Sequence, residues 1–180
     1  IYQEQDSVSQ EFRFSSANNS TLEWTGGAYF GETELDGNTK RNFIIPLPPQ
    51  FGGGFAPVST TTDYILNENA YALFGQITYN GIERTGMHLG LRLDQVEKSI
   101  HRNAFGLAGP VPLINLENDY SFVSPRAGID FELNDSSLVY VNTGISTKPG
   151  GFSAFIDNPQ SAAFNEEESW NNEIGLKKKW

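Results

Sequence analysis

The stretch from Tyr71 to Asn80, YALFGQITYN, decides the fold class of this chain. Its odd-numbered positions carry Tyr, Leu, Gly, Ile and Tyr, and its even-numbered positions carry Ala, Phe, Gln, Thr and Asn. A period of two residues is typical of a β-strand, whose side chains point alternately to the two faces of a sheet. A soluble sheet buries its apolar face, whereas a membrane barrel turns that face outward and keeps a polar interior. The function therefore depends on which face of this strand meets water.

The composition favours an ordered all-β protein. The chain has 180 residues, of which 38% are hydrophobic, and Gly (18), Phe (13) and Tyr (7) are plentiful. This balance suits twisted strands and tight turns. The formal net charge of -10 argues against nucleic acid as a partner, because binding to phosphates needs a basic surface. The absence of cysteine excludes a disulfide framework and thiolate metal sites.

The sequence contains no segment that could form a membrane helix. Such a helix needs about 18 or more consecutive apolar residues. The longest uncharged stretch, 42–62, is interrupted by prolines and glycines. A strand that crosses a membrane needs only about 10 alternating residues, so hydropathy does not decide between the two β-architectures. The first ten residues carry no targeting signal, which predicts that a signal was removed or that the chain begins inside a larger protein.

The alternation predicts about seven strands joined by connections of two kinds. The predicted strands cover residues 9–16, 21–32, 69–80, 86–98, 120–133, 137–147 and 169–179. The short connections fall at 17–20, 81–85 and 134–136, and the long ones at 33–68, 99–119 and 148–168. Short turns at one rim and long loops at the other are typical of up-and-down outer-membrane barrels, and a Greek-key sandwich has no reason to sort its loops in this way.

The strands are also long and have two distinct faces. Met87, Leu89, Leu91 and Leu93 share one face of their strand, opposite polar and charged residues. Several predicted strands reach about 11 to 14 residues, more than the roughly 5 to 6 of an ordinary strand. Pro125 lies inside one of them, and the strand assignment is kept because proline is tolerated at weakly bonded positions. Aromatic residues gather toward strand ends, as in an interfacial girdle: Trp24, Tyr29, Phe30, Tyr71, Tyr79, Tyr120 and Trp170.

A series of short motifs resembles a known family. The motifs are Gln10-Glu11-Phe12-Arg13, Trp24 with Gly27-Ala28-Tyr29-Phe30, Tyr71-Ala72-Leu73-Phe74-Gly75-Gln76, Gly90-Leu91-Arg92, Ser124-Pro125-Arg126-Ala127-Gly128, Lys148-Pro149-Gly150-Gly151-Phe152 and Trp170-Asn171-Asn172-Glu173-Ile174-Gly175-Leu176-Lys177. Over about residues 9–178, their order and spacing resemble the barrel of TonB-dependent outer-membrane receptors. Each motif alone is weakly specific, but the ordered series is specific.

The resemblance implies a role in energised import across the bacterial outer membrane. Such receptors typically close about 22 antiparallel strands around a plug domain and take up a scarce ligand, such as an iron-siderophore complex. The implied partners are outer-membrane lipid, the plug, the remaining barrel strands, the TonB complex and the small-molecule ligand. Residues 1–180 contain neither a plug nor the N-terminal box that engages TonB, so they resemble a piece of the barrel. An open edge at each end cannot lie unpaired in lipid.

Eight residues are predicted to face the lumen, where they would contact the plug or water: Glu11, Arg13, Gln76, Arg92, Asp94, Arg126, Asp130 and Glu173. In YALFGQITYN this assignment turns Leu73 and Ile77 to lipid. Phe74 then falls on the polar side, and we expect it to pack against the plug or a neighbouring lumen side chain. The loops 33–68, 99–119 and 148–168 are expected to supply ligand contacts. No catalytic residue, metal site or cofactor is predicted.

Other interpretations remain open at this stage. His88 and His101 are the two histidines, and their separation makes a shared metal improbable, although His101 could capture a metal or haem in a loop. Glu11 and Glu23 could face each other across a hairpin like a glycosidase pair. The run 166–168 could bind Ca²⁺ but is more typical of a solvated surface. Two further alternatives are a soluble carbohydrate-binding β-sandwich, which must bury its apolar faces between two sheets, and a passive porin.

Overall fold

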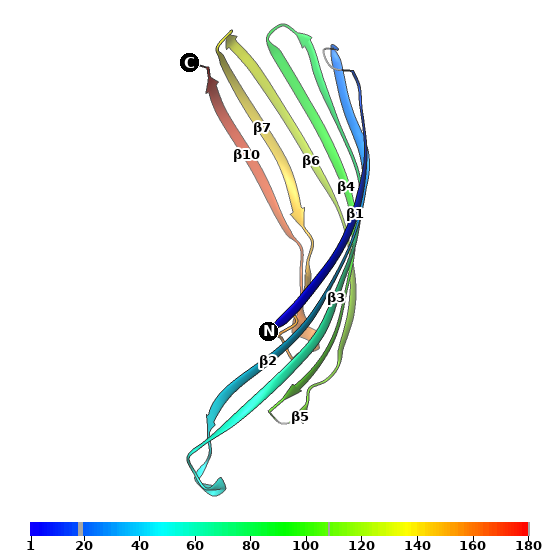
Figure 1. The fold of residues 1–180 in the computed structure, drawn as a ribbon. Helices are drawn as coiled ribbons and strands as arrows, with labels where there is room; N and C mark the ends of the chain where they lie inside the picture. The colour runs from blue at the N-terminus through cyan, green and yellow to red at the C-terminus, as the bar shows by residue number, and fades with distance from the viewer. Residues whose placement is uncertain (18–19, 108, 180) are drawn as a thin grey trace.

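The computed structural model describes residues 1–17, 20–107 and 109–179, which form one long antiparallel sheet. Seven long strands follow one another in the order β1-β2-β3-β4-β6-β7-β10. They are β1 (Tyr2–Ser15), β2 (Leu22–Pro46), β3 (Phe55–Ile82), β4 (Thr85–Gly106), β6 (Ile114–Asn134), β7 (Ser137–Lys148) and β10 (Glu167–Lys178). The sheet is open and strongly curved, and neighbours in the sequence are neighbours in space (Figure 1). The predicted all-β meander of about seven long strands is confirmed.

Short elements complete the described part of the chain. They are the 3₁₀ turn η1 (Pro49–Phe51), β5 (Gly109–Pro110), which pairs with β4, the small hairpin of β8 (Gly151–Phe152) and β9 (Ala163–Phe164), and the one-turn helix α1 (Pro159–Ala162). Across the described residues, no helix is both long enough and apolar enough to cross a membrane.

Tight turns lie at one end of the sheet and long hairpins at the other. The turn between β3 and β4 places Arg84 at φ 60°, a left-handed conformation uncommon for a residue other than glycine. In the turn between β6 and β7, the amide of Ser136 donates a 3.0 Å hydrogen bond to the side-chain oxygen of Asn134. Both tight turns lie at the upper end of the sheet in Figure 1, and the β2–β3 hairpin extends far beyond the opposite end. The predicted turn at 17–20 includes residues 18 and 19, which lie outside the described residues.

Two of the three predicted long loops are extended strands. β2 and β3 stay paired from Leu22 opposite Tyr79 to Pro46 opposite Phe55, and β4 pairs with β6 as far as Arg102 opposite Ile114. The prediction of loops over 33–68 and 99–119 was therefore wrong, because β2 and β3 extend over most of the first range and β4 and β6 over most of the second. Backbone hydrogen bonds continue these ladders whatever side chains they carry. Only the third connection, 149–166, leaves the main sheet, and it contains β8, α1 and β9.

Pro125 marks the place where the sheet divides. It lies inside β6 opposite Leu91 of β4, so the strand continues through the proline as predicted. The ladder between β6 and β7 runs from Asn134 to Arg126 and stops there, one residue before Pro125. A proline has no amide hydrogen to donate, so it suits the end of a ladder. Beyond this point, away from the tight turn between β6 and β7, β6 stays paired with β4, while β7 continues with β10.

No second sheet covers the apolar residues of the described strands. Leu89 is 65% exposed, Leu91 47%, Ile129 43% and Phe131 47%. A soluble β-sandwich would bury these four side chains between two sheets. The sandwich alternative is therefore wrong, and the long strands expose a contiguous apolar face, which is typical of an interaction surface.

Candidate functional site

The eight residues predicted to face the lumen all lie on one face of the sheet, which we call the polar face. The register places Arg13 and Arg92 in one row through Gly27 and Phe74, and Gln76 in the next row with Arg126. The alternation of side chains along each strand places the other four residues on the same face as these, namely Glu11, Asp94, Asp130 and Glu173. The structure therefore places on one face residues up to 162 positions apart in the sequence, although Glu11 and Glu173 lie on strands at opposite edges of the sheet.

Arginine and aromatic side chains stack at the centre of the polar face. The guanidinium carbon of Arg92 lies 5.7 Å from the ring centroid of Tyr29 and 5.9 Å from that of Phe74. Arg13 approaches the Phe74 ring from the neighbouring strand pair, at 5.7 Å. Each such contact contributes about 0.5–1 kcal/mol at an exposed site. Phe74 therefore packs against neighbouring polar-face side chains, which is one of the two outcomes predicted for it.

The same arginines are held by carboxylates on their own strands. Arg13 donates to Glu11 at 2.7 Å and Arg92 donates to Asp94 at 2.9 Å. These pairs are partly exposed, so each contributes at most about 1 kcal/mol. Their main effect is to fix the direction of the guanidinium groups. A depression of about 260 Å³ lies among Arg13, Arg92 and Arg126.

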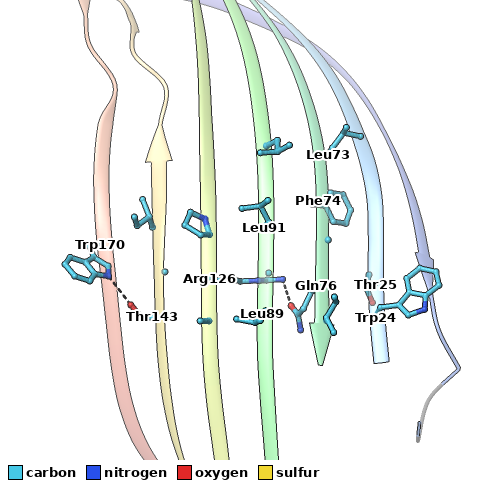
Figure 2. A pocket seen from close by; sticks show the side chains of 18 residues that line it. Trp24, Thr25, Leu73, Phe74, Gln76, Leu89, Leu91, Arg126, Thr143 and Trp170 are labelled. Atoms are coloured by element: carbon cyan, nitrogen blue, oxygen red, sulfur yellow. Dashed lines mark hydrogen bonds between the residues drawn. The ribbon is translucent and has the colours of Figure 1, made fainter. Parts of the chain in front are cut away.

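Arg126 reaches across a whole strand to its partner. Its guanidinium donates a hydrogen bond to the side-chain oxygen of Gln76, although β4 lies between β6 and β3 (Figure 2). The side chain crosses β4 at Gly90, where an added Cβ would lie 2.5 Å from the Arg126 Nε. Only glycine permits this close approach, so Gly90 allows Arg126 to lie flat on the sheet.

Two further polar clusters lie nearer the tight turns. His88 hydrogen-bonds to Asp130, and its other ring nitrogen lies 3.2 Å from the hydroxyl of Thr78. The phenol of Tyr140 donates a 2.6 Å hydrogen bond to Glu173. These contacts give His88, Asp130 and Glu173 side-chain partners within a single layer of strands.

The opposite face, which we call the apolar face, carries exposed aliphatic and aromatic residues. On β6 it runs from Val123 to Leu133, which matches the roughly 9–11 residues of a tilted membrane strand. A shallow groove of about 920 Å³ is lined by residues of six strands, with Trp24 near one side and Trp170 near the other (Figure 2). Trp170 donates a 3.0 Å hydrogen bond from its indole nitrogen to the hydroxyl of Thr143, so the N–H group of this indole is satisfied.

The character of both faces changes along the strands, and rows of paired residues show where. The last apolar row across β2, β3, β4 and β6 consists of Ala28, Leu73, Leu93 and Val123. The next consists of Phe30, Tyr71, Gln95 and Ser121, and the one after it of Glu32, Asn69, Glu97 and Asp119. The rings of Phe30 and Tyr71 are 5.5 Å apart. An aromatic row between apolar and acidic rows is typical of a membrane interface.

The predicted aromatic girdle needs one correction. Trp24, Phe30, Tyr71, Tyr79 and Trp170 share the apolar face, as a girdle requires. Tyr29 and Tyr120 do not, because their register places them on the same face as Arg92. Tyr29 stacks on Arg92, and Tyr120 is 6% exposed.

Beyond the aromatic row, the apolar face becomes an acidic surface. It carries Glu32, Glu34 and Asp36 on β2, opposite Asp6 and Glu4 of β1 in the register. The phenol of Tyr2 donates a 2.5 Å hydrogen bond to Glu4, and this bond, together with the negative charge of the carboxylate, raises the pKa of Tyr2. Carboxylates in consecutive rows are stable only where water solvates them. This part of the sheet therefore belongs outside an apolar layer.

The polar face changes in the opposite direction, and here the structure has its core. Tyr64, Ile100 and Ile114 are at most 3% exposed, and they have the same parity as Gln76, Arg92 and Arg126 on their strands. They are covered by the connection between β7 and β10, through Phe152, Ala154 and Ala162. The part of the polar face farthest from the tight turns, which we call its outer part, therefore carries apolar side chains. There the sheet and the connection that covers it form two packed layers.

The alternatives based on metal binding and hydrolysis receive no support. His88 and His101 lie 13 positions apart on β4, and because this number is odd their side chains point to opposite faces. No group of three or more His, Cys, Asp or Glu residues suited to a metal occurs within the described parts of the chain. Glu11 pairs with Tyr29, which is six residues from Glu23 on β2, or about 20 Å along a strand. The two glutamates therefore do not face each other.

Comparison with known proteins identifies the family. The family sequence model described as "TonB dependent receptor-like, beta-barrel" matches residues 1–180. The chain belongs to the TonB-dependent receptor family. Its curved sheet of long antiparallel strands, with one apolar and one polar face, is what a segment of such a receptor barrel requires.

Solved structures of uptake receptors share the fold. The ferric yersiniabactin uptake receptor FyuA from Yersinia pestis superposes with a TM-score of 0.79 and 19% identity, covering 99% of this chain and 27% of that one. The siderophore receptor PiuA from Acinetobacter baumannii gives 0.67 and 16%, covering 99% and 30%. The ferric-catecholate import receptor Fiu from E. coli K12 gives 0.51 and 11%, covering 98% and 38%. The chain therefore spans well under half of each receptor's length.

Sequence reasoning missed the buried residues of this receptor segment. Tyr64, Ile100, Arg102 and Ile114 fall inside the stretches predicted as loops. Their signal was present as a second alternating pattern, at even positions of β3, β4 and β6. That pattern is apolar on the face where the first pattern is polar, so it was not recognised as a continuation of the same strands.

Proposed function

We propose that this chain forms part of the barrel wall of a bacterial outer-membrane receptor, which imports a scarce ligand such as an iron-siderophore complex with energy from the TonB complex. The observation that carries the proposal is the pair of faces on the seven long strands. One face is apolar over a membrane-sized height and is bounded by an aromatic row, and the other is polar over the same height. Membership of the receptor family supports the same role.

In this proposal each face has a separate partner. The apolar face meets outer-membrane lipid. The polar face, with Glu11, Arg13, Gln76, Arg92, Asp94, Arg126, Asp130 and Glu173, lines the lumen and contacts the plug domain or water. β1 and β10 pair with the remaining strands of the barrel, because an unpaired edge in lipid would leave backbone groups without hydrogen bonds. The ligand-facing rim includes residues from the three segments that were predicted as long loops, 33–68, 99–119 and 148–168.

A siderophore is the proposed ligand class because of the relatives. FyuA, PiuA and Fiu are described as a ferric yersiniabactin uptake receptor, a siderophore receptor and a ferric-catecholate import receptor. The wall itself has no enzymatic site in this proposal. Its residues exclude lipid, hold the plug and shape the passage.

Deletion of the full-length gene tests the proposal. The producing bacterium is grown without free iron, and uptake of radioactive iron is measured from a ferric tris-catecholate and a ferric tris-hydroxamate. We expect the deletion to abolish uptake from one of them, and the full-length gene to restore it only in cells with a functional TonB complex. Unchanged uptake of both, or recovery of the protein outside the outer membrane, would overturn the proposal.

A further inference from the structure

The connection between β7 and β10, residues 149–166, lies flat on the outer part of the polar face, and we call it the strap. The strap can reach this face because β7 separates from β6 at Pro125. β8 and β9 pair within it, and the amide of Ser153 donates a 2.7 Å hydrogen bond to the carbonyl oxygen of Ala162. The strap is therefore a folded unit with its own backbone bonds.

One side of the strap is buried against the sheet. Phe152, Ala154 and Ala162 are at most 9% exposed, and they form one cluster with Ile100 and Ile114. Among the described residues this is the hydrophobic cluster that joins two layers. Lifting the strap would expose all of these side chains to water, so apolar burial favours the closed position.

A buried charge sits beside this cluster. The side chain of Arg102 is 2% exposed, and it donates to the carboxylate of Asp157 and, at 3.3 Å, to the carbonyl oxygen of Ile156. Both acceptors belong to the strap. The Nε of Arg102 has no hydrogen-bond partner. With the strap closed, Arg102 therefore depends on Asp157 as its counter-ion, because an unpaired guanidinium is strongly disfavoured when buried.

Two apolar side chains of the strap remain partly exposed. Phe155 is 45% exposed and Ile156 39%. Arg41 of β2 lies over the Phe155 ring, with its guanidinium carbon 4.9 Å from the centroid, and Tyr64 meets the same ring edge-on at 5.8 Å between centroids. Phe155 thus connects the strap to the long β2–β3 hairpin.

We infer that Asp157 is a positioning residue, which keeps the strap closed on the inner wall of the extracellular mouth by neutralising the buried Arg102, and that the closed strap thereby presents Phe155 to the incoming ligand. The inference rests on the proposed function for the direction of the mouth and for the ligand. It differs from a simple salt-bridge role in one consequence. Removing Asp157 leaves a buried charge without a partner and opens the strap, whereas removing the charge of Arg102 leaves the apolar cluster intact and the strap closed.

Cysteine labelling of the full-length receptor in outer membranes tests this inference. Residues 1–180 contain no cysteine, and any cysteine elsewhere in the full-length receptor is first replaced by serine. Ala154→Cys, at a position 6% exposed, then reports an open strap by reaction with a maleimide polyethylene glycol. Gln160→Cys, at an exposed position of the strap, reports the amount of folded receptor. We expect Asp157→Ala to raise the labelling rate at position 154 at least tenfold, and Arg102→Met to leave it unchanged.

The double variant provides the decisive comparison. Arg102→Met combined with Asp157→Ala should return labelling at position 154 to the original rate, because no buried charge remains. If Asp157→Ala does not assemble, as judged at position 160, Asp157→Asn makes the same comparison with less change in volume. Unchanged labelling with Asp157→Ala or Asp157→Asn, or open straps in both Arg102→Met and the double variant, would overturn the inference.

The ligand-facing part has its own readout. Phe155→Ala keeps both Arg102 and Asp157, so labelling at position 154 should stay low. Uptake of radioactive iron from whichever of the ferric tris-catecholate or tris-hydroxamate the receptor imports should fall at least fivefold at limiting concentration. Unchanged uptake would refute the role of Phe155. Absence of uptake from both complexes in the unaltered receptor would instead count against the proposed function and leave the labelling results valid.

Discussion

The ring of Phe74 lies directly on the backbone of Gly27 in the neighbouring strand. A Cβ added at Gly27 would come within 2.6 Å of Cζ of this ring and within 2.3 Å of the carbonyl oxygen of Phe12. The two residues face each other in the register of β2 and β3. Gly27 thus provides the space in which Phe74 lies flat, and that position lets Arg13 and Arg92 stack on the ring.

Gly27→Ala should destabilise the barrel. The added methyl group meets a rigid ring and a backbone oxygen, so strands or ring must shift, at a cost of about 1–3 kcal/mol. We expect a lower unfolding temperature for the full-length receptor in detergent, followed by loss of the heat-modifiable band on electrophoresis. Gly26→Ala is the matched control, because its Cβ would point to the other face, where the nearest atom is the Phe74 carbonyl oxygen at 3.6 Å. Equal losses for both variants would contradict this account.

The apolar face should reject a charge at mid-height. Leu91 is 47% exposed and lies between Leu89 and Leu93 on β4. If this face meets lipid, Leu91→Arg costs about 2–4 kcal/mol near the membrane centre. Less folded receptor should then reach the outer membrane, measured as the heat-modifiable fraction in isolated membranes. Asn142→Arg on the polar face controls for an added charge at a solvated position and should assemble normally. Normal assembly of Leu91→Arg would argue against lipid contact.

The existence of two faces could be predicted from the sequence. Leu89 and Leu91 alternate with Gly90 and Arg92. Alternation of this kind was enough to assign the eight residues predicted to face the lumen to one face, and the structure places them on one face. Which face meets lipid could not be derived from parity, because a solvated outer surface gives the same alternation. In the sequence, the ordered connections and the series of motifs favoured an apolar face turned to lipid, which stays a prediction.

The full length of the strands could not be predicted, because the pattern inverts along each of them. On β4 the apolar residues lie at odd positions up to Leu93 and at even positions from Val96 to Ile100. A strand that leaves an apolar layer and enters water exchanges the requirements of its two faces, and a search for one alternating pattern stops at that point. The partner that covers Ile100, the strap, comes from a segment more than 50 residues away. Contacts of that range are not encoded in local periodicity.

The inversion predicts where a charge becomes acceptable on the apolar face. Glu117 has the same parity as Val123 and Pro125 on β6 but lies three rows beyond the last apolar row. Glu117→Arg should therefore leave assembly unchanged, whereas Val123→Arg should reduce it by an amount smaller than Leu91→Arg, because the cost falls toward the interface. The heat-modifiable fraction in outer membranes measures all three. Equal effects at Glu117 and Val123 would place the boundary elsewhere.

The stacking of Arg92 on Phe74 should appear as a coupling energy. Phe74→Ala removes the ring from both Arg13 and Arg92, and each contact contributes about 0.5–1 kcal/mol. In a double-mutant cycle, Phe74→Ala and Arg92→Ala should together destabilise the receptor by about 0.5–1 kcal/mol less than the sum of the single changes. Arg92→Lys should lose part of this coupling, since a compact ammonium does not stack as a planar guanidinium does. Phe74→Ala combined with Lys177→Ala, a cation that stacks on Tyr140 instead, is the control and should be additive. Additive behaviour of Phe74 and Arg92 as well would mean that the rings orient these arginines without stabilising the wall.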